Sequence, residues 1–509
     1  MKRVSILLLL VIALGVDCLA ADKSAKKIIE RYKKAVGANA ARRVKSTLIV
    51  GNIKTADGAT GRYSYQAAMP ESMRVDIEAG ELRVSECYNG KSAWRMEGGR
   101  LRTLLGEEAK RLRLEALIAA TRLADISRNR IVAQSPITAI IEGKAANSIE
   151  LVKDDARVKL FFDDASGLII KRERETPDGF EEIFYGDYRK VDGVMEPHSI
   201  RIKRGSNEMN VTVARIDHNR GVDVAAFRYP RIEGARPLPD VEALLKTVVA
   251  NQEKIEQMRE RYTCRMTQTE RKLDGDGRVK QSETKTYEVT PVGNRTVERL
   301  MSVNGKELSA AEREKEDRRV QKDVEEIIKR REKELEKKER DRERGREQEE
   351  DDDRVTILDF LHLCEITSMR REAFRGVEVI AFDFEPRKSV KPKNRVEAIV
   401  SKLAGTLWVD EQAGQIVRLE ARLTDSFKMA GGLLASVSPS TAFAFEQEKV
   451  DGEVWLPSLT EANISARVML FSKINRSVKR SYTDYKKHRV DSTYETGKPA
   501  GSIKPDNLR

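Results

Sequence analysis

The chain has 509 residues and a formal net charge of +12, and 35% of its residues are charged. This length is enough for two or more domains, and the dispersed charge favours a solvated surface. The sequence contains no GxSxG, HExxH or phosphate-loop motif, and no Cys/His spacing typical of zinc. Its histidines are scattered: His198, His218, His362 and His488. We therefore expect a protein that is not an enzyme and that has no metal or cofactor.

Residues 1–20 have the three parts of a secretory signal. Lys2 and Arg3 form a basic start, residues 4–16 form an apolar run, and small side chains near the end predict cleavage after Ala20. The run is shorter than the roughly 20 residues that span a bilayer. We expect export to the periplasm, with an uncleaved anchor or a lipoprotein attached through Cys18 as alternatives. An exported basic protein is expected to meet anionic envelope components and no nucleic acid.

The first predicted domain covers residues 21–233. It begins with a helix over 25–36 and contains a second helix over about 107–123, each with an apolar stripe. Asn89-Gly90 predicts a hairpin turn between two strands. Three other segments are predicted strands: 46–50 is β-branched and apolar, and 62–66 and 73–77 alternate apolar and polar residues as half-buried strands do. Helices and hairpin-connected strands in this order predict an α+β fold.

A linker containing Pro and Gly, at 234–239, separates this domain from a second one at 240–509. The second domain restarts with a helix and strands and then has a charged insertion at about 309–354. Ser309 and Glu312 have capping-box spacing, which predicts a helix of up to about 40 residues. Its apolar positions form one short seam near the start, which favours docking on its own domain over a coiled-coil partner.

One strand-turn-strand pattern occurs in both domains. The first copy covers 161–171 and is followed by Val-Asp-Gly-Val at 191–194. The second covers 408–418 and is followed by Val-Asp-Gly-Glu at 450–453. Repetition of an ordered set of motifs predicts two copies of one fold.

Two further features leave alternatives open. The segment 429–436 is apolar and rich in small residues, so it either folds onto the core or contacts a membrane. Removal of the signal leaves Cys87, Cys264 and Cys364. Either Cys264 pairs with Cys364, or all three are buried thiols.

Several motifs occur in the order typical of LolA-type periplasmic lipoprotein carriers. In the first domain they are at 70–75, 89–94, 163–167, 191–193 and 222–230. The second domain shares them more loosely, through Gly305, Trp408, 450–452 and 490–494. The chain thus resembles the LolA and LolB superfamily of outer-membrane lipoprotein carriers. It departs from LolA carriers at Met69, where the family has a basic residue before the proline that is Pro70 here.

This resemblance implies two tandem incomplete antiparallel β-barrels, each covered by helices. It also implies a carrier that holds acyl chains of a lipid or lipoprotein in an apolar cavity, in outer-membrane lipoprotein sorting. Aromatic residues on the strands are the candidates to line the cavities: Trp94, Phe162, Phe184, Trp408 and Phe445. Three residues of the second helix are the candidate lid: Leu117, Ala120 and Leu123. All of them also suit an ordinary hydrophobic core.

A periplasmic sensor that uses the same fold to bind a protein is the second hypothesis. Two-domain regulators of anti-sigma factors also resemble this superfamily. The charged helix at 309–354 is the candidate surface for an envelope partner. Copurified acyl lipid would favour the carrier, and a retained protein partner would favour the sensor.

Overall fold

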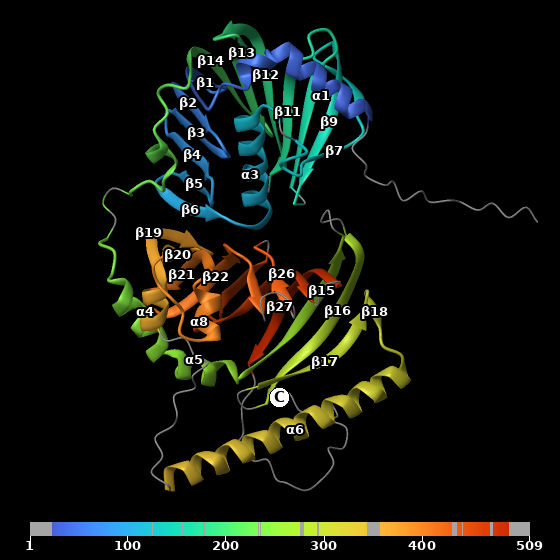
Figure 1. The fold of residues 1–509 in the computed structure, drawn as a ribbon, viewed down its shortest axis with the longest axis vertical. Helices are drawn as coiled ribbons and strands as arrows, with labels where there is room; N and C mark the ends of the chain where they lie inside the picture. The colour runs from blue at the N-terminus through green and yellow to red at the C-terminus, as the bar shows by residue number, and fades with distance from the viewer. Residues whose placement is uncertain are drawn as a thin grey trace, which may run out of the picture. The chain divides into compact units, whose positions relative to one another are not determined.

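The computed structural model describes residues 23–487, apart from 125, 155, 177–178, 233, 235, 275–278, 293–294, 344–356, 430–434, 440 and 469–471. The chain divides into two compact units, Met1–Ala235 (unit 1) and Arg236–Arg509 (unit 2) (Figure 1). The division falls inside the segment 234–239 expected as a linker. The predicted signal peptide and its cleavage site after Ala20 lie outside the described residues.

Unit 1 is a 14-stranded antiparallel sheet with α-helices against one face and a 3-10 turn against the other. The helical segments are α1 (Lys23–Val36), α2 (Ala38–Ala41), α3 (Gly106–Thr121) and the 3-10 turn η1 (Val224–Phe227). The first strands are β1 (Ser46–Thr55), β2 (Thr60–Ala68), β3 (Ser72–Ala79), β4 (Leu82–Asn89), β5 (Ala93–Glu97), β6 (Arg100–Leu104) and β7 (Val132–Ala133). The others are β8 (Ile137–Ile141), β9 (Lys144–Lys153), β10 (Ala156–Asp163), β11 (Ile169–Thr176), β12 (Gly179–Val191), β13 (Val194–Arg204) and β14 (Asn207–His218).

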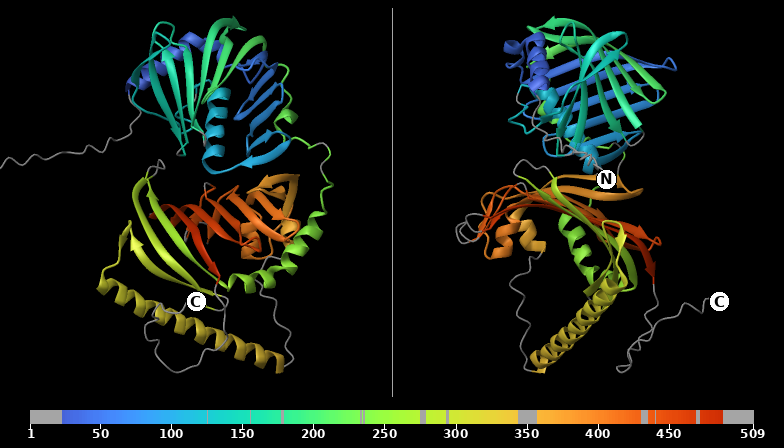
Figure 2. Two further views of the ribbon diagram at one scale, coloured as in Figure 1. Left: turned by 180° about the vertical axis from the view of Figure 1, so that it is seen from behind. Right: turned by 90° about the vertical axis from the view of Figure 1, so that its right-hand side faces the viewer.

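The unit 1 sheet curls around α3. Its strand order is β6-β5-β4-β3-β2-β1-β14-β13-β12-β11-β10-β9-β7, with β8 paired to β9. Helix α3 contacts β2 to β5 near one end of this order and β10 near the other, so the two ends approach the same helix (Figure 2). Among the described strands, β6 and β7 do not pair with each other, so the curl is an open one and no closed barrel forms.

Helix α1 packs on the same face as α3. Its apolar stripe buries Ile29, Tyr32 and Val36 in one cluster with Leu117 of α3. The Tyr32 ring meets the Phe162 ring edge to face, with centroids 5.7 Å apart. Burial of this stripe against the strands, more than helix propensity, holds a short charged helix in place.

Unit 2 is a 13-stranded sheet in the order β18-β17-β16-β15-β27-β26-β25-β22-β21-β20-β19, with β24 joining β23 to β26. Its helices are α4 (Val241–Ala250), α5 (Gln252–Arg259), α6 (Ala310–Glu343), α7 (Ile357–Leu363) and α8 (Arg395–Val400). Its first strands are β15 (Tyr262–Leu273), β16 (Val279–Val292), β17 (Arg295–Val303), β18 (Lys306–Glu307), β19 (Cys364–Phe374), β20 (Val377–Pro386) and β21 (Leu403–Asp410). The others are β22 (Gln415–Leu423), β23 (Phe427–Met429), β24 (Ala435–Val437), β25 (Ala442–Val450), β26 (Val454–Val468) and β27 (Ser472–Lys487).

The repeated turns occupy equivalent places in the two sheets. Asp163 ends β10 and Asp410 ends β21, and each carboxylate accepts backbone N–H bonds within its own turn, at 2.8 Å and 3.0 Å respectively. The Asp-Gly pairs join β12 to β13 and β25 to β26. Asp192 and Gly193 both have positive φ, 47° and 87°, which is the backbone that a tight hairpin requires.

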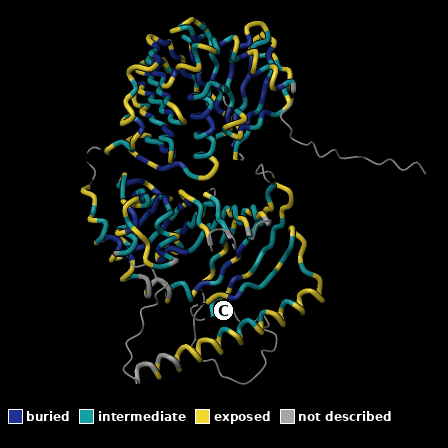
Figure 3. Tube along the Cα trace, in the orientation of Figure 1, coloured by how far each residue is buried: buried dark blue, intermediate teal, exposed yellow. Residues whose placement is uncertain are grey.

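Helix α6 is 34 residues long and lies along strand β17. Glu312 accepts a bond from the backbone N–H of Ser309 at 2.8 Å, and the Ser309 hydroxyl accepts one from the Glu312 N–H at 3.4 Å. This reciprocal pair is the capping box expected from the sequence. Figure 3 shows that the helix is exposed along most of its length. The predicted loop at 429–436 lies largely outside the described residues.

Replacing Gly37 with alanine is expected to destabilise unit 1 by about 1–3 kcal/mol more than replacing Gly58 with alanine. Both glycines have nearly the same φ, +93° and +91°, so both substitutions carry the same left-handed penalty. A Cβ on Gly37 would lie 2.4 Å from the carbonyl oxygen of Gly193, whereas a Cβ on Gly58 would meet nothing within 4 Å. Hydrogen exchange of peptides from α1 and β13 measures the difference, and equal losses in the two variants would contradict it.

Candidate ligand-binding site

Helix α3 lies inside the curl of the unit 1 sheet and buries apolar side chains on both flanks. On one flank, Leu112 belongs to a cluster with Met73 of β3. On the other flank, Leu117 belongs to a cluster with Leu160 of β10. The helix therefore joins strands that are far apart in the sheet order.

A second apolar cluster fills the curl beside α3 and draws on both halves of the sheet. Its buried members are Ile49, Ile53, Tyr63, Ile77, Ala79, Ile183, Ile200, Ile202, Met209, Val211, Val213 and Ile216. An acyl chain that takes the volume of α3 would therefore contact apolar side chains from both halves of the sheet.

Seven charged side chains project toward this apolar interior, three of them buried (Glu115, Arg174 and Glu181) and four partly exposed, and we call them the interior charge cluster. Its members are Glu86 (β4), Arg95 (β5), Glu115 (α3), Arg172 and Arg174 (β11), Glu181 (β12) and Arg204 (β13). The Glu115 carboxylate, 1% exposed, lies 2.7 Å from Arg172 Nη1 and 3.1 Å from Arg174 Nη1. Arg174 also reaches Glu86 at 3.1 Å and Glu181 at 2.8 Å. Arg174 thus ties β11, β12, β4 and α3 together.

The arginines of the interior charge cluster favour the ionised form of Glu181 despite its burial. Burial opposes ionisation of Glu181, yet Arg174, Arg204 and Arg172 outweigh it and lower the pKa of Glu181 to about 2. Burial raises the pKa of the neighbouring Tyr63 and Tyr185 phenols. These ion pairs connect β4, in one half of the curled sheet, with β11 and β12, in the other half, and connect β11 with α3.

A second polar group fixes the carboxyl-terminal end of α3. Arg122 caps the helix in a left-handed conformation, with φ 46°. Its guanidinium donates to Glu196 and to the Thr47 hydroxyl, both at 2.8 Å. His218 Nε2 lies 2.9 Å from the same Glu196 carboxylate. Burial opposes the ionisation of Glu196, but His218 and Arg122 lower its pKa. Charged contacts therefore hold α3 at its middle and at its end.

Trp94 lies on the face of the sheet away from α3. Its neighbour Ala93 packs on the α3 side, so strand alternation turns Trp94 to the other face. There it is fully buried beneath η1, and its Nε1 donates to the Phe227 carbonyl oxygen at 3.2 Å. Trp94 therefore does not line the α3 side of the sheet, contrary to the prediction from the sequence.

The two phenylalanines predicted in unit 1 lie on opposite faces. Phe162 is buried against α1 in the helix-covered interior. Phe184 is half-buried on the other face, where the Arg201 guanidinium stacks 4.4 Å from its ring centroid. Its neighbours Ile183 and Tyr185 face the interior. Phe162 alone of the two is placed to line the interior of unit 1.

The two aromatic residues predicted to line a cavity in unit 2 also lie on opposite faces of its sheet. Leu407 and Val409 pack on α4, so Trp408 between them faces away from that helix. It is fully buried, and its indole N–H donates to Glu372. Phe445 is half-buried and lies opposite Leu419, which packs on the α4 side. Phe445 is therefore on the helix-covered face, and Trp408 is not.

The predicted lid residues lie in and just after α3. Leu117 and Ala120 are buried on the helix. The helix ends at Thr121, two residues before the expected end, so Leu123 lies beyond it with φ 60°. Leu123 is 1% exposed and belongs to the same cluster as Leu117. Leu117 and Ala120 are thus buried on α3 itself, and Leu123 is buried in the segment that follows the helix.

The three cysteines that remain after removal of the predicted signal form no disulfide among the described residues. Cys87, Cys264 and Cys364 are free, buried thiols, and burial raises the pKa of Cys264 and Cys364 to about 11. Within the described residues, no group of three or more His, Cys, Asp or Glu side chains is arranged to hold a metal ion. Among the helices described here, none has the length and apolar character needed to cross a membrane.

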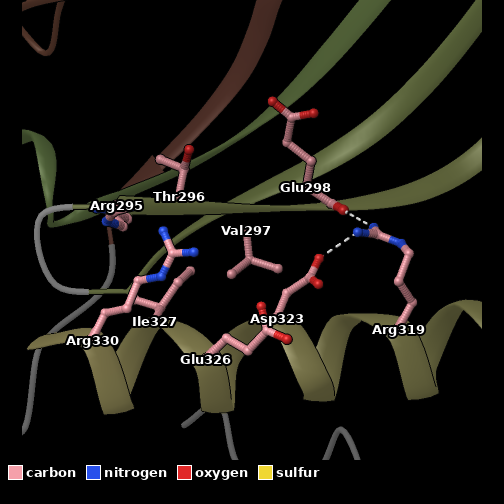
Figure 4. A pocket seen from close by; sticks show the side chains of 9 residues that line it. All are labelled: Arg295, Thr296, Val297, Glu298, Arg319, Asp323, Glu326, Ile327 and Arg330. Atoms are coloured by element: carbon pink, nitrogen blue, oxygen red, sulfur yellow. Dashed lines mark hydrogen bonds and ion pairs between the residues drawn. The ribbon is translucent and has the colours of Figure 1, made fainter.

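A shallow groove lies between α6 and β17 of unit 2 (Figure 4). Val297 points from the strand toward Ile327 of the helix and is 5% exposed. Asp323 and Arg319 form an ion pair at the same contact. The apolar seam expected near the start of the charged helix is thus used against its own unit.

No family model matches the sequence, and no curated protein matches it. Among solved structures, the chain is similar to a LolA superfamily protein from Nitrosomonas europaea, with 17% identity, 40% of this chain and 97% of that chain covered, and a TM-score of 0.28. A putative outer membrane lipoprotein-sorting protein domain from Vibrio parahaemolyticus has 10% identity, the same coverage and a TM-score of 0.27. The MucA/MucB complex from Pseudomonas aeruginosa has 8% identity, 92% and 99% coverage and a TM-score of 0.16. The Nitrosomonas europaea protein is named as a member of the superfamily that the sequence motifs resemble.

Proposed function

We propose that this protein is an exported, periplasmic carrier in which unit 1 shelters acyl chains of a lipid or lipoprotein beneath α3. The observation that carries the proposal is the position of α3, which covers an apolar interior and contacts both ends of a curled, open sheet. The sequence resemblance to LolA-type carriers supports the same reading. Movement of α3 opens a volume lined by apolar side chains from both halves of the sheet.

The energetics of such a carrier are favourable for long chains. Each methylene removed from water contributes about 0.8 kcal/mol. An entering chain replaces contacts that Leu112, Leu114 and Leu117 of α3 make in the closed form. Phe162 lies on the same face and is a proposed lining residue. The exchange of one apolar surface for another allows loading and release without a large net cost.

Unit 2 is proposed to be a second copy of the same fold. Unit 1 contains the strand order β2-β1-β14-β13-β12-β11-β10-β9, and unit 2 contains β16-β15-β27-β26-β25-β22-β21-β20. The two orders match strand for strand, with the repeated turns at the same junctions. Phe445 is the proposed lining residue of unit 2.

The mature protein purified from envelope extract is expected to retain about one acyl lipid per chain, and mass spectrometry of the bound lipid measures it. Leu117→Asp puts a charge under α3 and should abolish retention. Lys110→Asp, on the more exposed side of the same helix, should leave it intact. A wild-type protein with no lipid, or equal retention in both variants, would count against the carrier.

A sensor that binds an envelope protein through α6 is the second candidate. The observation that favours it is the exposed, densely charged surface that α6 presents along most of its length. A photoreactive residue at Leu335, which is 52% exposed, should then crosslink to one protein in envelope extract. Failure to crosslink any protein specifically would remove this candidate.

A further inference from the structure

The lid presents one buried carboxylate to two arginines of the sheet. Arg172 and Arg174 are two residues apart on β11, so their side chains share the interior face. Both guanidinium groups reach Glu115, at 2.7 Å and 3.1 Å. Paired guanidinium groups are the usual protein partners of carboxylate and phosphate groups. Glu115 is thus bound in a site that recognises an oxyanion.

The charge balance of the interior depends on α3 staying in place. With α3 docked, three arginines of the interior charge cluster, Arg172, Arg174 and Arg204, face the three glutamates Glu86, Glu115 and Glu181. The fourth arginine, Arg95, lies nearer to Glu97, at 2.9 Å, than to Glu86, at 3.8 Å. Removal of Glu115 with the helix leaves three arginines facing two glutamates. Buried guanidinium groups without partners are costly, so the open form favours an anion at the place of the lost carboxylate.

Helix α3 also places apolar side chains beside this carboxylate. Leu112, Leu114 and Leu117 are buried around Glu115 on the helix. The segment that occupies the interior thus has the composition of an anionic amphiphile, with an apolar part and one oxyanion. A ligand of the same chemistry can replace both parts at once.

We propose that the ligand of unit 1 is an anionic amphiphile whose carboxylate or phosphate takes the place of Glu115 on Arg172 and Arg174, while its acyl chain takes the place of the α3 leucines. This inference rests on the proposed carrier function and names the class of its ligand. Glu115 is a latch residue that the head group displaces. Uncharged acyl compounds leave Arg172 without the carboxylate of Glu115 and leave Arg174 with Glu86 and Glu181 alone, so they bind more weakly.

The test compares dodecanoate with dodecanol on the full mature chain, by isothermal titration calorimetry at pH 8 and below micellar concentrations. The two ligands have the same chain length and differ in charge. Wild-type protein is expected to prefer dodecanoate by about 10–100-fold, the range for one charge-assisted hydrogen-bonded pair. Arg172→Gln should reduce that preference to near one. Arg201→Gln, on the opposite face of the sheet, should leave it unchanged.

Two further variants keep the test independent of folding defects and of lid opening. The double variant Glu115→Gln with Arg172→Gln removes both partners of one ion pair, so no buried charge is left alone, and it should also lose the preference. Glu115→Gln by itself weakens the latch and should tighten both ligands by a similar factor, because the displaced side chain is absent from both bound states. A preference that rises in Glu115→Gln would show that Glu115 stays in place, which overturns displacement.

The outcomes separate this inference from the carrier function. Binding of neither ligand would overturn the carrier and the inference together. Equal binding of both ligands, or a preference that survives the double variant, would overturn the inference and leave the carrier standing. Inorganic phosphate at millimolar concentration distinguishes a lipid head group from a free anion: it should not displace dodecanoate, and displacement would overturn the assignment to an amphiphile.

Discussion

Replacing Arg174 with methionine is expected to destabilise unit 1 by about 3–5 kcal/mol, the usual cost of removing one partner of a buried ion pair. Methionine preserves much of the volume of the side chain. It leaves the buried carboxylates of Glu86, Glu115 and Glu181 without the guanidinium that joins them. Hydrogen exchange of α3 and β11 peptides in the full chain measures the opening free energy of this region.

The controls separate lost charge pairing from lost packing. Adding Glu86→Gln to Arg174→Met neutralises one stranded carboxylate and should recover part of the loss, because Arg95, the other partner of Glu86, keeps Glu97 at 2.9 Å. Arg189→Met removes an ion pair whose arginine is 62% exposed, and it should cost less than about 1 kcal/mol. A double variant as unstable as Arg174→Met would show that packing is the cause.

The loss in Arg174→Met should depend on pH in one direction. The pKa of Glu181 is about 2 in the folded protein and near 4.5 when unperturbed, so its ionised pairing stabilises the fold above about pH 4.5. That contribution disappears as the pH falls toward 2. The difference in stability between wild type and Arg174→Met should therefore shrink over this range, and a constant difference would contradict the role of charge.

The local features of the fold could be predicted from the sequence. Asp-Gly pairs at 192–193 and 451–452 define hairpins, because few other residues adopt two successive positive φ values. Ser309 and Glu312 define the start of α6, because a capping box satisfies backbone groups that are adjacent in the chain. The alternation at 62–66 and 73–77 correctly places two strands. Each of these features depends on contacts within a few residues.

The direction of the aromatic side chains could not be predicted. Phe161 and Phe162 are both buried, and so are Leu407, Trp408 and Val409. Where both faces of a strand are covered, alternation of apolar and polar residues disappears and the inner face cannot be identified. Trp94 is covered by the distant segment η1, which local pattern does not reveal.

The interior charge cluster was also missed. The sequence Lys-Arg-Glu-Arg-Glu at 171–175 has the composition of a solvated strand. Arg174 is buried and Arg172 is partly buried because Glu115, Glu86 and Glu181 from other elements pair with them. A usable signal was the position of Glu115 among the leucines of α3, since a lone carboxylate on an apolar stripe requires a buried partner.

The structure assigns α6 a role that neither its charge nor its length indicated. In unit 1, strands β4 to β6 continue the sheet beyond β3, whereas in unit 2 only the two-residue β18 follows β17. In unit 2, side chains of helix α6 instead form hydrogen bonds with backbone groups on the open edge of β17. The Leu300 N–H donates to Glu316 at 2.7 Å, and the Glu298 carbonyl oxygen accepts a bond from Arg319. An uncovered edge strand is a template for pairing with another chain.

Val297→Asp is therefore expected to release α6 and cause self-association. The substitution places a charge at the buried contact with Ile327, which is costly enough to undock a helix held mainly by exposed ion pairs. Hydrogen exchange should show faster exchange in peptides covering 297–303, and light scattering should show dimers or larger species that grow with concentration. Thr296→Asp, at an exposed position on the same strand, should leave the protein unchanged in both measurements.

A second substitution identifies the surface that associates. Pairing of two β17 edges requires the outward N–H of Leu300, and proline at that position removes this donor without removing a bond to β16. Val297→Asp with Leu300→Pro should therefore stay monomeric if the exposed edge is the cause. Association that persists would come from the freed apolar seam of α6, around Val320 and Ile327. A Val297→Asp protein that remains monomeric with full protection at 297–303 would show that α6 is not needed to cover the edge.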